Sequence, residues 1–294
     1  MTSVLIVNWN TRDLLAECLG SIRVAFGDEP HEVIVVDNAS PDGSAAMVRE
    51  KFPEVRLIEL AGNAGYAAAN NLAASRAAGD DLLFLNPDTE LRRGCVEALR
   101  TRLHSDTRIA LVAPKLILPD GTIQHSCRGF PSPLNVILDA LGLAALFPRF
   151  FGSYRMLAMD YEVAQPVPQP MATCWLMNRE AWETVGGFDE RFPIFFNDVD
   201  WCLRAAKLGL EAWYEPAAVV EHVGGASTRQ VRPQMVWESH LSLLRYYRKH
   251  LPGGVGSPTY WVLALPVILG ALVRAKGWHD GFRPHRDHRE LEHP

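Results

Sequence analysis

Two aspartates follow short apolar runs that have the composition of buried β-strands. Asp37 comes directly after Val33–Val36, and Asp88 comes three residues after Leu82–Leu85. Ligands of open α/β sheets bind at the carboxyl ends of the strands, which is where both side chains are expected. A carboxylate at Asp37 can accept hydrogen bonds from a base or ribose, and one at Asp88 can hold a hard cation against a diphosphate. Each aspartate taken alone fits a turn or a helix cap equally well.

A second pair of acids lies in the segment Asn197–Asp200, where Asp198 and Asp200 stand two residues apart at an expected helix start. A carboxylate near a sugar hydroxyl in a partly dry cleft can take its proton as the oxygen attacks, which is general-base chemistry. The competing interpretation is pairing with the positive end of the helix dipole, favourable by about 0.3–1 kcal/mol per residue.

One histidine closes an apolar, strand-like segment. His222 ends the segment 214–222 and is followed by Gly224 and Gly225. A neutral imidazole at this position can complete a metal shell begun by Asp88. A hydrogen-bonded surface histidine before a glycine turn is the alternative.

The segment Gly62–Asn71 follows an expected strand and opens an expected helix. Backbone amides and the positive end of a helix dipole near such a segment favour a bound phosphate. The GxGxxG dinucleotide spacing is absent from this segment, and the chain contains no Walker GxxxxGK[ST] motif. Nicotinamide and P-loop chemistry are therefore not expected.

Apolar strands alternate with segments of helical period through the first hundred or so residues, which predicts a parallel sheet with crossover helices. We expect strands near residues 3–8, 32–37, 55–60, 81–86 and 109–113. The first expected helix has apolar residues at three- and four-residue spacing, and either Asn10 or Thr11 is expected to cap it. Alanines in the helix expected over 65–78 would let it sit close to the sheet.

The second half of the chain begins after Pro114. We expect a hairpin turn at 118–122, a strand at 171–177, a helix at 179–185, a helix starting near residue 198 and an amphipathic helix at 233–250. The apolar stretch 260–273 is broken by Pro266 and is shorter than the roughly twenty residues that a membrane-spanning helix needs. Two interpretations of it stay open, a helix in a membrane interface and a buried C-terminal helix pair. The polar tail 279–294 is expected to be disordered.

The composition fits one elaborated α/β domain. The chain has 294 residues, of which 48% are hydrophobic and 21% charged, and its net charge of −5 gives no general attraction to nucleic acid. The five cysteines are odd in number, widely spaced and without a CxxC pair, which argues against disulfides and structural zinc and fits a reducing cytoplasm. The N-terminus reads as a first strand rather than an export signal.

Taken in order, these segments resemble family 2 glycosyltransferases, especially a bacterial rhamnosyltransferase-like branch. The resemblance covers roughly residues 3 to 230. It is carried by these segments: Val4–Asn10, Val36–Ser40, Gly62–Asn71, Leu85–Asp88, Arg179–Trp182, Val185–Glu190, Asn197–Asp200, and His222 with Gly225 and Ser227.

The resemblance implies a GT-A fold, a Rossmann-like and mostly parallel α/β sheet flanked by helices. It implies a glycosyltransferase domain over 1–230, with a nucleotide-sugar half at 1–114 and an acceptor half at 115–230. A helical extension, 231–278, and the tail would follow. On the membrane-interface interpretation, the extension contacts the cytoplasmic face of the inner membrane peripherally, and on the other interpretation it is a buried helix pair.

The resemblance also assigns roles within the site. Asp37 would contact the nucleotide base, with Trp9 and Asn63 lining its pocket, and Gly65 and Asn70 would belong to the same donor site. Asp88 matches the last position of the family's acidic metal motif, whose first position is Asn86 here, so magnesium or manganese would be held largely by the donor diphosphate. His222 would be a further metal ligand.

Asp198 matches the catalytic base, and Asp200 is the second choice for that role. Asn197 stands where the family usually has glutamate, and the missing charge favours an ionised Asp198. The implied reaction is direct displacement with inversion, from a dTDP- or UDP-linked sugar to a glycan or polyprenyl-linked acceptor in surface polysaccharide synthesis. The apolar segments 134–151 and 260–273 favour a lipid-linked acceptor. Two alternatives stay open, an inactive sugar-nucleotide-binding protein of the same fold and a nucleotidyltransferase.

Overall fold

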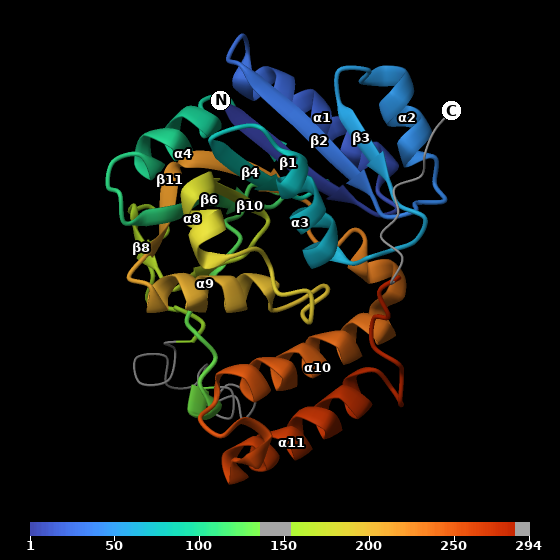
Figure 1. Cartoon of the computed structure of the whole chain (residues 1–294), viewed down its shortest axis with the longest axis vertical. Helices are drawn as coiled ribbons and strands as arrows, with labels where there is room; N and C mark the ends of the chain where they lie inside the picture. The colour runs from blue at the N-terminus through green and yellow to red at the C-terminus, as the bar shows by residue number, and fades with distance from the viewer. Residues whose placement is uncertain (136–153, 286–294) are drawn as a thin grey trace.

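The computed structural model describes residues 1–135 and 154–285, and its centre is a mixed sheet with helices on both faces (Figure 1). Within the described residues, this sheet has nine strands. The strands of the chain are β1 (Thr2–Asn8), β2 (His31–Asp37), β3 (Arg56–Glu59), β4 (Asp81–Leu85), β5 (Thr89–Leu91), β6 (Ile109–Ile117), β7 (Cys127–Arg128), β8 (Gln165–Val167), β9 (Gln169–Pro170), β10 (Cys174–Asn178) and β11 (Glu211–His222). The helices are α1 (Arg12–Phe26), α2 (Ser44–Lys51), α3 (Tyr66–Arg76), α4 (Cys95–Leu103), α8 (Arg179–Val185), α9 (Asn197–Lys207), α10 (Arg232–His250) and α11 (Pro258–Arg274).

The strand order is β3-β2-β1-β4-β10-β6-β11-β5, and β8 pairs with β11 outside this path. Strands β1 to β4 pair in parallel, as do β6 and β11, whereas β10 runs antiparallel between β4 and β6. All five strands expected in the first half are present. The expected strand at 171–177 is β10, and the expected hairpin turn is closed by a hydrogen bond from the Leu118 amide to the Thr122 carbonyl at 2.8 Å.

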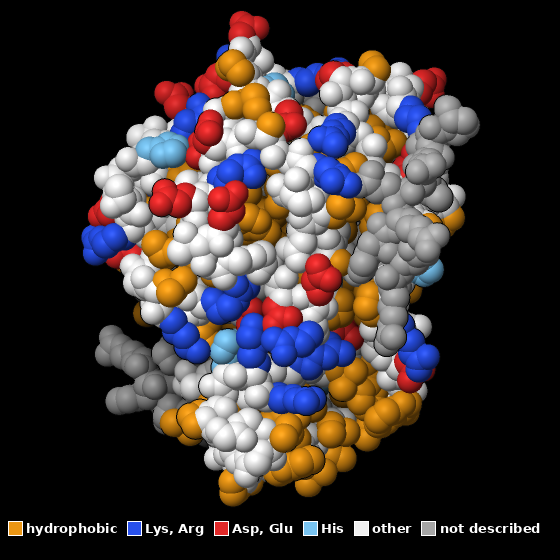
Figure 2. Space-filling model, viewed as in Figure 1, with side chains coloured by type: hydrophobic (Ala, Val, Ile, Leu, Met, Phe, Trp, Pro, Cys, Tyr) orange, Lys and Arg blue, Asp and Glu red, His pale blue; other side chains and the backbone are white. Residues whose placement is uncertain are grey.

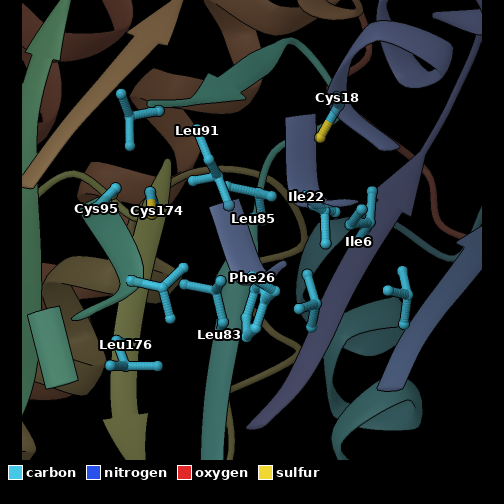
Figure 3. Packing of buried hydrophobic residues seen from close by; sticks show 14 of the residues in the cluster. Ile6, Cys18, Ile22, Phe26, Leu83, Leu85, Leu91, Cys95, Cys174 and Leu176 are labelled. Carbon is cyan, nitrogen blue, oxygen red and sulfur yellow. The ribbon is translucent and has the colours of Figure 1, made fainter. Parts of the chain in front are cut away.

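The two faces of the sheet bury two separate cores, because successive side chains of a strand point to opposite faces. In β1, Val4 and Ile6 pack with α1, α2 and α4, while Leu5 and Val7 pack with α3, α8 and α9. Figure 3 shows the first core, where side chains of α1 meet the inner strands and Cys174. The second core contains four buried alanines of α3, which confirms that small side chains bring this helix close to the sheet.

The expected side-chain cap of α1 is not formed, although Thr11 holds the N-cap position. The Thr11 hydroxyl instead donates to Oδ1 of Asn8 at 2.6 Å, and Asn10 has a left-handed backbone with φ of 55°. The first helical amide, that of Arg12, donates to Oδ2 of Asp42 in the loop after β2. The prediction of a local cap was wrong because a residue thirty positions away supplies the acceptor.

The last two helices, α10 and α11, form an antiparallel pair below the sheet (Figure 1). One side of α11 packs on α10, as the helix-pair interpretation of 260–273 expects, and the other side is exposed, so contact with a membrane interface stays a prediction. No helix in the described part of the chain has the length and apolar character needed to cross a membrane. Most of the apolar segment 134–151 lies outside the described residues.

The first part of the C-terminal tail is folded against the body, which corrects the expectation of disorder for 279–285. The Phe282 amide donates to Oε2 of Glu238 on α10 at 3.0 Å, and the His285 amide donates to the Asn63 carbonyl at 2.7 Å. The tail therefore runs from α11 along α10 to the loop before α3. The prediction relied on the polar side chains of this segment, whereas its main-chain amides hold it in place. Residues 286–294 lie outside the described residues.

All five cysteines are buried free thiols. Burial raises the pKa of Cys18 and Cys95 to about 12 and that of Cys127 to about 11.

Candidate active site

A cavity of about 390 Å³ opens at the carboxyl ends of β1, β2 and β4. After β3, the chain crosses through α3 to the other side of β1 and forms β4, so the strand order reverses at this point. Such a switch point is where open α/β sheets bind ligands. The cavity is lined by Val7, Trp9, Asn38, Asn63, Tyr66, Asn86, Pro87, Asp88, Ile194, Gly225, Ala226, Ser227, Thr228, Val231, Gln234, Met235, Gly281, Phe282 and Arg283. Four of the predicted site residues are therefore in one wall: Trp9, Asn63, Asn86 and Asp88.

Asp88 and His222 are in contact, although they are 134 positions apart, because β11 pairs with β5 directly after Asp88. Nε2 of His222 lies 3.4 Å from Oδ1 of Asp88, and the Ala226 amide donates to Oδ2 of Asp88 at 3.3 Å. Both side chains are buried. Burial raises the pKa of Asp88, but the hydrogen bond and charge of His222, together with the Ala226 amide, bring it below its ordinary value. Asp88 is therefore a carboxylate at neutral pH.

The orientation of the imidazole suits a cation at this pair. Nδ1 of His222 lies 2.7 Å from Oε1 of Gln124, and since an amide oxygen only accepts, Nδ1 carries the proton. Nε2 then faces the Asp88 carboxylate, to which it donates when it carries a proton, and a divalent cation in place of that proton would bind both the ring nitrogen and the carboxylate. Among the described residues, no group of three or more His, Cys, Asp or Glu side chains is arranged as a metal site. The pair thus fits an ion that takes its remaining ligands from elsewhere.

The loop around Asn86 is held by its main chain. The Asn86 carbonyl accepts from the Thr89 hydroxyl at 2.6 Å, and its amide donates to the Thr173 carbonyl at 2.9 Å. Asn38 and Tyr66 also line the cavity, although the sequence analysis did not select them. Asn38 stands directly after Asp37 at the end of β2, and this position is the sequence feature that could have identified it as a site residue.

Asp37 is buried and does not line the cavity. Its Oδ1 accepts from Nδ2 of Asn8 at 2.7 Å, and its Oδ2 accepts from the Ser40 amide at 2.8 Å. Burial raises the pKa of Asp37 above its ordinary value, despite these hydrogen bonds. In this structure the carboxylate fixes the loop after β2, so its contact with a base stays a prediction.

The N-terminus of α3 does not present free amides to a phosphate. The amides of Tyr66 and Ala67 both donate to the Pro193 carbonyl, at 2.7 and 3.1 Å. Gly65 has a φ of 88°, and a Cβ at this position would be 2.9 Å from the same carbonyl. Asn70 donates to the Tyr66 carbonyl within the helix and does not line the cavity. The interpretation of the segment Gly62–Asn71 as a phosphate site is corrected accordingly, since a distant loop supplies the acceptor, and the donor-site roles of Gly65 and Asn70 stay predictions.

Asp198 lies at the start of α9, outside the cavity wall. Its Oδ1 accepts from the Val199 amide at 2.8 Å and its Oδ2 from Nε2 of Gln169 at 3.2 Å. Burial raises the pKa of Asp198 and outweighs the hydrogen bonds that lower it. The expected effect of Asn197, a comparison with glutamate at that position, stays a prediction, because the raised pKa is relative to a free aspartate. The side-chain amide of Asn197 instead donates to the carbonyls of Phe192 and Ile194.

Tyr66 lies within electrostatic range of both carboxylates of the predicted mechanism, Asp88 and Asp198. It lines the cavity, and its hydroxyl donates to the Ala172 carbonyl at 2.8 Å. Burial raises the pKa of the Tyr66 phenol, and the charges of Asp198 and Asp88 raise it further. Both carboxylates therefore lie within electrostatic range of one side chain in the cavity wall.

Asp200 does not belong to the cavity. It is fully buried, and its carboxylate contacts Arg204 at 2.9 Å, His250 at 2.8 Å and Lys249. Burial raises its pKa, but the hydrogen bonds of His250, Lys249 and Arg204 bring it below its ordinary value. A carboxylate held by these cations is a poor base, so the structure places Asp200 in the contact between α9 and α10 instead.

Comparison with solved structures defines the fold class. The chain superimposes on a mannosyltransferase from Pyrobaculum calidifontis, solved in complex with GDP-Man and Mn²⁺, with a TM-score of 0.59 and 22% identity. The match covers 94% of this chain and 74% of the other. The protein thus has the GT-A fold, as the resemblance implied.

Residues 3–186 match the sequence profile of Glycosyl transferase family 2, and the chain belongs to this family. It is a glycosyltransferase, which excludes the nucleotidyltransferase alternative. The chain is 29% identical over 273 residues to the N-acetylglucosaminyl-diphospho-decaprenol L-rhamnosyltransferase of Mycobacterium tuberculosis, covering 88% of each chain. It is also 29% identical over 265 residues to the O-antigen biosynthesis protein RfbC of Myxococcus xanthus, covering 87% of this chain and 20% of that protein.

Proposed function

We propose that this protein is an inverting glycosyltransferase that uses a magnesium or manganese ion. It transfers a sugar, with rhamnose as the first candidate, from a dTDP- or UDP-linked donor to a polyprenyl-linked glycan in cell-surface polysaccharide synthesis. The observation that carries this proposal is the contact between Asp88 and His222 beside the cavity at the switch point of the sheet.

The cavity suits the donor in size and lining. Its volume of about 390 Å³ lies within the range of small-molecule sites. Trp9 offers an aromatic face for a base, and Nδ2 of Asn63 offers a donor at its edge, whereas the side-chain amide of Asn38 is bonded to the backbone of Ala64 and Gly65. Asp37 would act on the base through the loop that it fixes, or by direct contact.

Asp88 and His222 would hold the divalent cation, with Gln124 fixing the imidazole. The bound cation neutralises the negative charge that develops on the departing diphosphate. Asn86, at the first position of the motif, supplies an amide instead of a second carboxylate, so the donor diphosphate would complete the coordination shell.

Asp198 would be the general base. The acceptor oxygen forms its bond to the anomeric carbon as the bond to the diphosphate breaks, and the hydroxyl proton passes to Asp198. Attack opposite to the leaving group inverts the anomeric configuration. A raised pKa favours proton uptake by this carboxylate.

The exposed side of α11 supports a lipid-linked acceptor. Five side chains of α11 are more than half exposed: Trp261, Val262, Leu265, Leu269 and Val273. The segment 258–279 contains no Asp or Glu, and its cations Arg274 and Lys276 are exposed. An apolar surface flanked by cations fits an anionic bilayer, so we assign α11 to the cytoplasmic face of the membrane. The acceptor named for the mycobacterial relative is a diphospho-decaprenol, which agrees with this surface.

The test is a screen of dTDP-rhamnose and UDP-hexoses by thermal shift and by nucleoside diphosphate release, with and without manganese. Asp198→Asn should lower the rate of transfer by about 10²–10⁴-fold while the thermal shift by the donor is retained. Donor binding without any transfer by the wild type would support the inactive alternative, which the position of Asp198 outside the cavity wall favours. If none of the nucleotide sugars shifts the melting temperature, the proposed donor class is wrong.

A further inference from the structure

A second cavity, of about 500 Å³, lies between the loop 190–193, the end of α10 and the C-terminal tail. Four of its lining side chains are cationic and one is acidic: Arg191, Arg245, Arg248, Lys249 and Glu190. We propose that this cavity, called here the cationic cavity, binds the diphosphate of a lipid-linked acceptor. The inference rests on the proposed function, because it locates one part of the acceptor of that reaction.

The acidic neighbours of the cationic cavity hold its cations in position. Lys249 lies 2.7 Å from Oδ2 of Asp189, and Arg191 lies 2.6 Å from the same oxygen. Arg245 pairs with the buried Glu238. These partners restrict the side chains, so less conformational entropy is lost when an anion binds.

Arg248 is the cation with the most freedom to bind a ligand. Its side chain is exposed, and within the described ranges it forms no ion pair. A guanidinium matches the geometry of phosphate oxygens and can donate two parallel hydrogen bonds. The acids Asp189, Asp200 and Glu238 beside the lining neutralise most of its positive charge, so Arg248 is the cation that a diphosphate would engage.

The cationic cavity adjoins the donor cavity. Phe282 lines both, and the neighbouring residues Pro193 and Ile194 line one each. The loop 190–196 continues directly into α9, which begins with Asn197 and Asp198. The two cavities thus share one lining residue, and the loop beside both leads directly to the predicted base.

On its other side, α10 packs on α11, whose outer surface is apolar. Figure 2 shows this arrangement, with a band of Lys and Arg side chains above the hydrophobic surface at the lower end of the molecule. A lipid-linked acceptor carries its sugar, its diphosphate and its hydrocarbon chain in that order. The donor cavity, the cationic cavity and the surface of α11 follow one another in the same order.

The test uses farnesyl diphosphate as a short lipid diphosphate, titrated calorimetrically into protein saturated with manganese and dTDP or UDP. The nucleotide fills the donor cavity, so that only a second site remains. We expect Arg248→Glu to weaken binding at least about tenfold, because a charge-assisted hydrogen bond is lost and a repulsion is added. The control Arg93→Glu makes the same charge change on the exposed loop before α4 and should bind like the wild type.

Inorganic pyrophosphate should displace farnesyl diphosphate, and farnesol, which has no phosphate, should not. Equal affinities of the wild type and Arg248→Glu would overturn the inference, as would displacement by farnesol. So would a wild type in which saturating nucleotide abolishes farnesyl diphosphate binding. The thermal shift by the nucleotide is measured on all three proteins. If the nucleotide gives no thermal shift with the wild type, the proposed donor is wrong. If the nucleotide gives a thermal shift but farnesyl diphosphate does not bind, only the present inference is wrong.

Discussion

The imidazole of His222, at the end of β11, faces the carboxylate of Asp88, which follows β4, at a separation of 3.4 Å. The contact joins two parts of the chain that lie 134 positions apart. It also places one ring nitrogen toward the carboxylate because Gln124 accepts a hydrogen bond from the other.

Gln124→Leu should weaken metal binding without abolishing it. The substitution leaves His222 free to rotate, and loss of such a support lowers metal affinity by about 10–100-fold in characterised sites. The manganese concentration for half-maximal turnover should rise by that factor, while Asp88→Asn should lose at least about a hundredfold in turnover. A manganese titration unchanged by Gln124→Leu would contradict the orientation assigned to His222.

The pH dependence of turnover should report Asp198. The base must be ionised, so the rate should fall as the pH drops through a pKa above the ordinary value for aspartate. Because the folded protein disfavours the ionised form, the free energy of unfolding should fall as the pH rises from the ordinary pKa through the raised one. Asp198→Asn should remove this fall and lower kcat by about 10²–10⁴-fold.

The measurements are a pH–rate profile and urea unfolding between pH 3.5 and 8. A wild-type kcat in Asp198→Asn would contradict the assignment of the base. A wild-type pH dependence of stability in the same variant would contradict the raised pKa of Asp198.

Asp200→Asn should destabilise the protein by about 3 kcal/mol, since it leaves Arg204, Lys249 and His250 without their buried anion. The pKa of Asp200 is lowered, so its contribution is present above the ordinary aspartate pKa and is lost as the pH falls through the lowered value. The control Asp106→Asn removes a partly exposed partner of Arg108 and should cost less than about 1 kcal/mol. Urea unfolding at pH 7 measures both, and equal costs would refute the structural role of Asp200.

Gly65→Ala should destabilise more than Gly43→Ala. Both glycines have positive φ, at 88° and 84°, and an alanine in this conformation costs about 1–2 kcal/mol. A Cβ at residue 65 would also approach the Pro193 carbonyl to 2.9 Å, whereas residue 43 has open space around it. The difference in melting temperature between the two variants measures the cost of the Cβ–carbonyl contact, because the backbone strain is common to both. Equal melting temperatures would show that the loop at Pro193 moves freely.

Leu265→Glu combined with Leu269→Glu should reduce binding to vesicles of phosphatidylglycerol and phosphatidylethanolamine by more than tenfold. Both leucines are exposed on α11, and each would lose roughly 1.5–3 kcal/mol of apolar burial in the bilayer. Leu208→Glu, at an exposed position after α9, is the control and should co-sediment like the wild type. Wild-type binding that is insensitive to salt would contradict the contribution of Arg274 and Lys276.

Local patterns in the sequence predicted the strands and the position of the site. Apolar runs of β-branched residues specify buried strands, and the carboxyl ends of parallel strands must meet at one edge. This argument was right for Asp88, which lines the cavity, but Asp37 lies outside the lining, and Trp9 and Asn86, which also line it, came from the family resemblance. It succeeded for Asp88 because each step depended on residues close together in the chain.

The parts that were missed depend on distant partners. The helix start at Tyr66 looks like a phosphate site until Pro193 brings its carbonyl to the same amides. Asp200 looks like a second base until α10 brings Lys249 and His250, about fifty residues later. Neither partner has a pattern that identifies it in the sequence, because a carbonyl or a lysine acquires its role only from tertiary packing.

The five buried thiols make this chain convenient for labelling. With pKa values of about 11 to 12 at Cys18, Cys95 and Cys127, almost no thiolate exists at neutral pH, and burial keeps reagents away from all five. A cysteine introduced at Leu269 would therefore be the site where maleimide dyes attach to the native protein. A fluorophore at that position would report the depth at which α11 enters a bilayer, with no need to replace a native cysteine first.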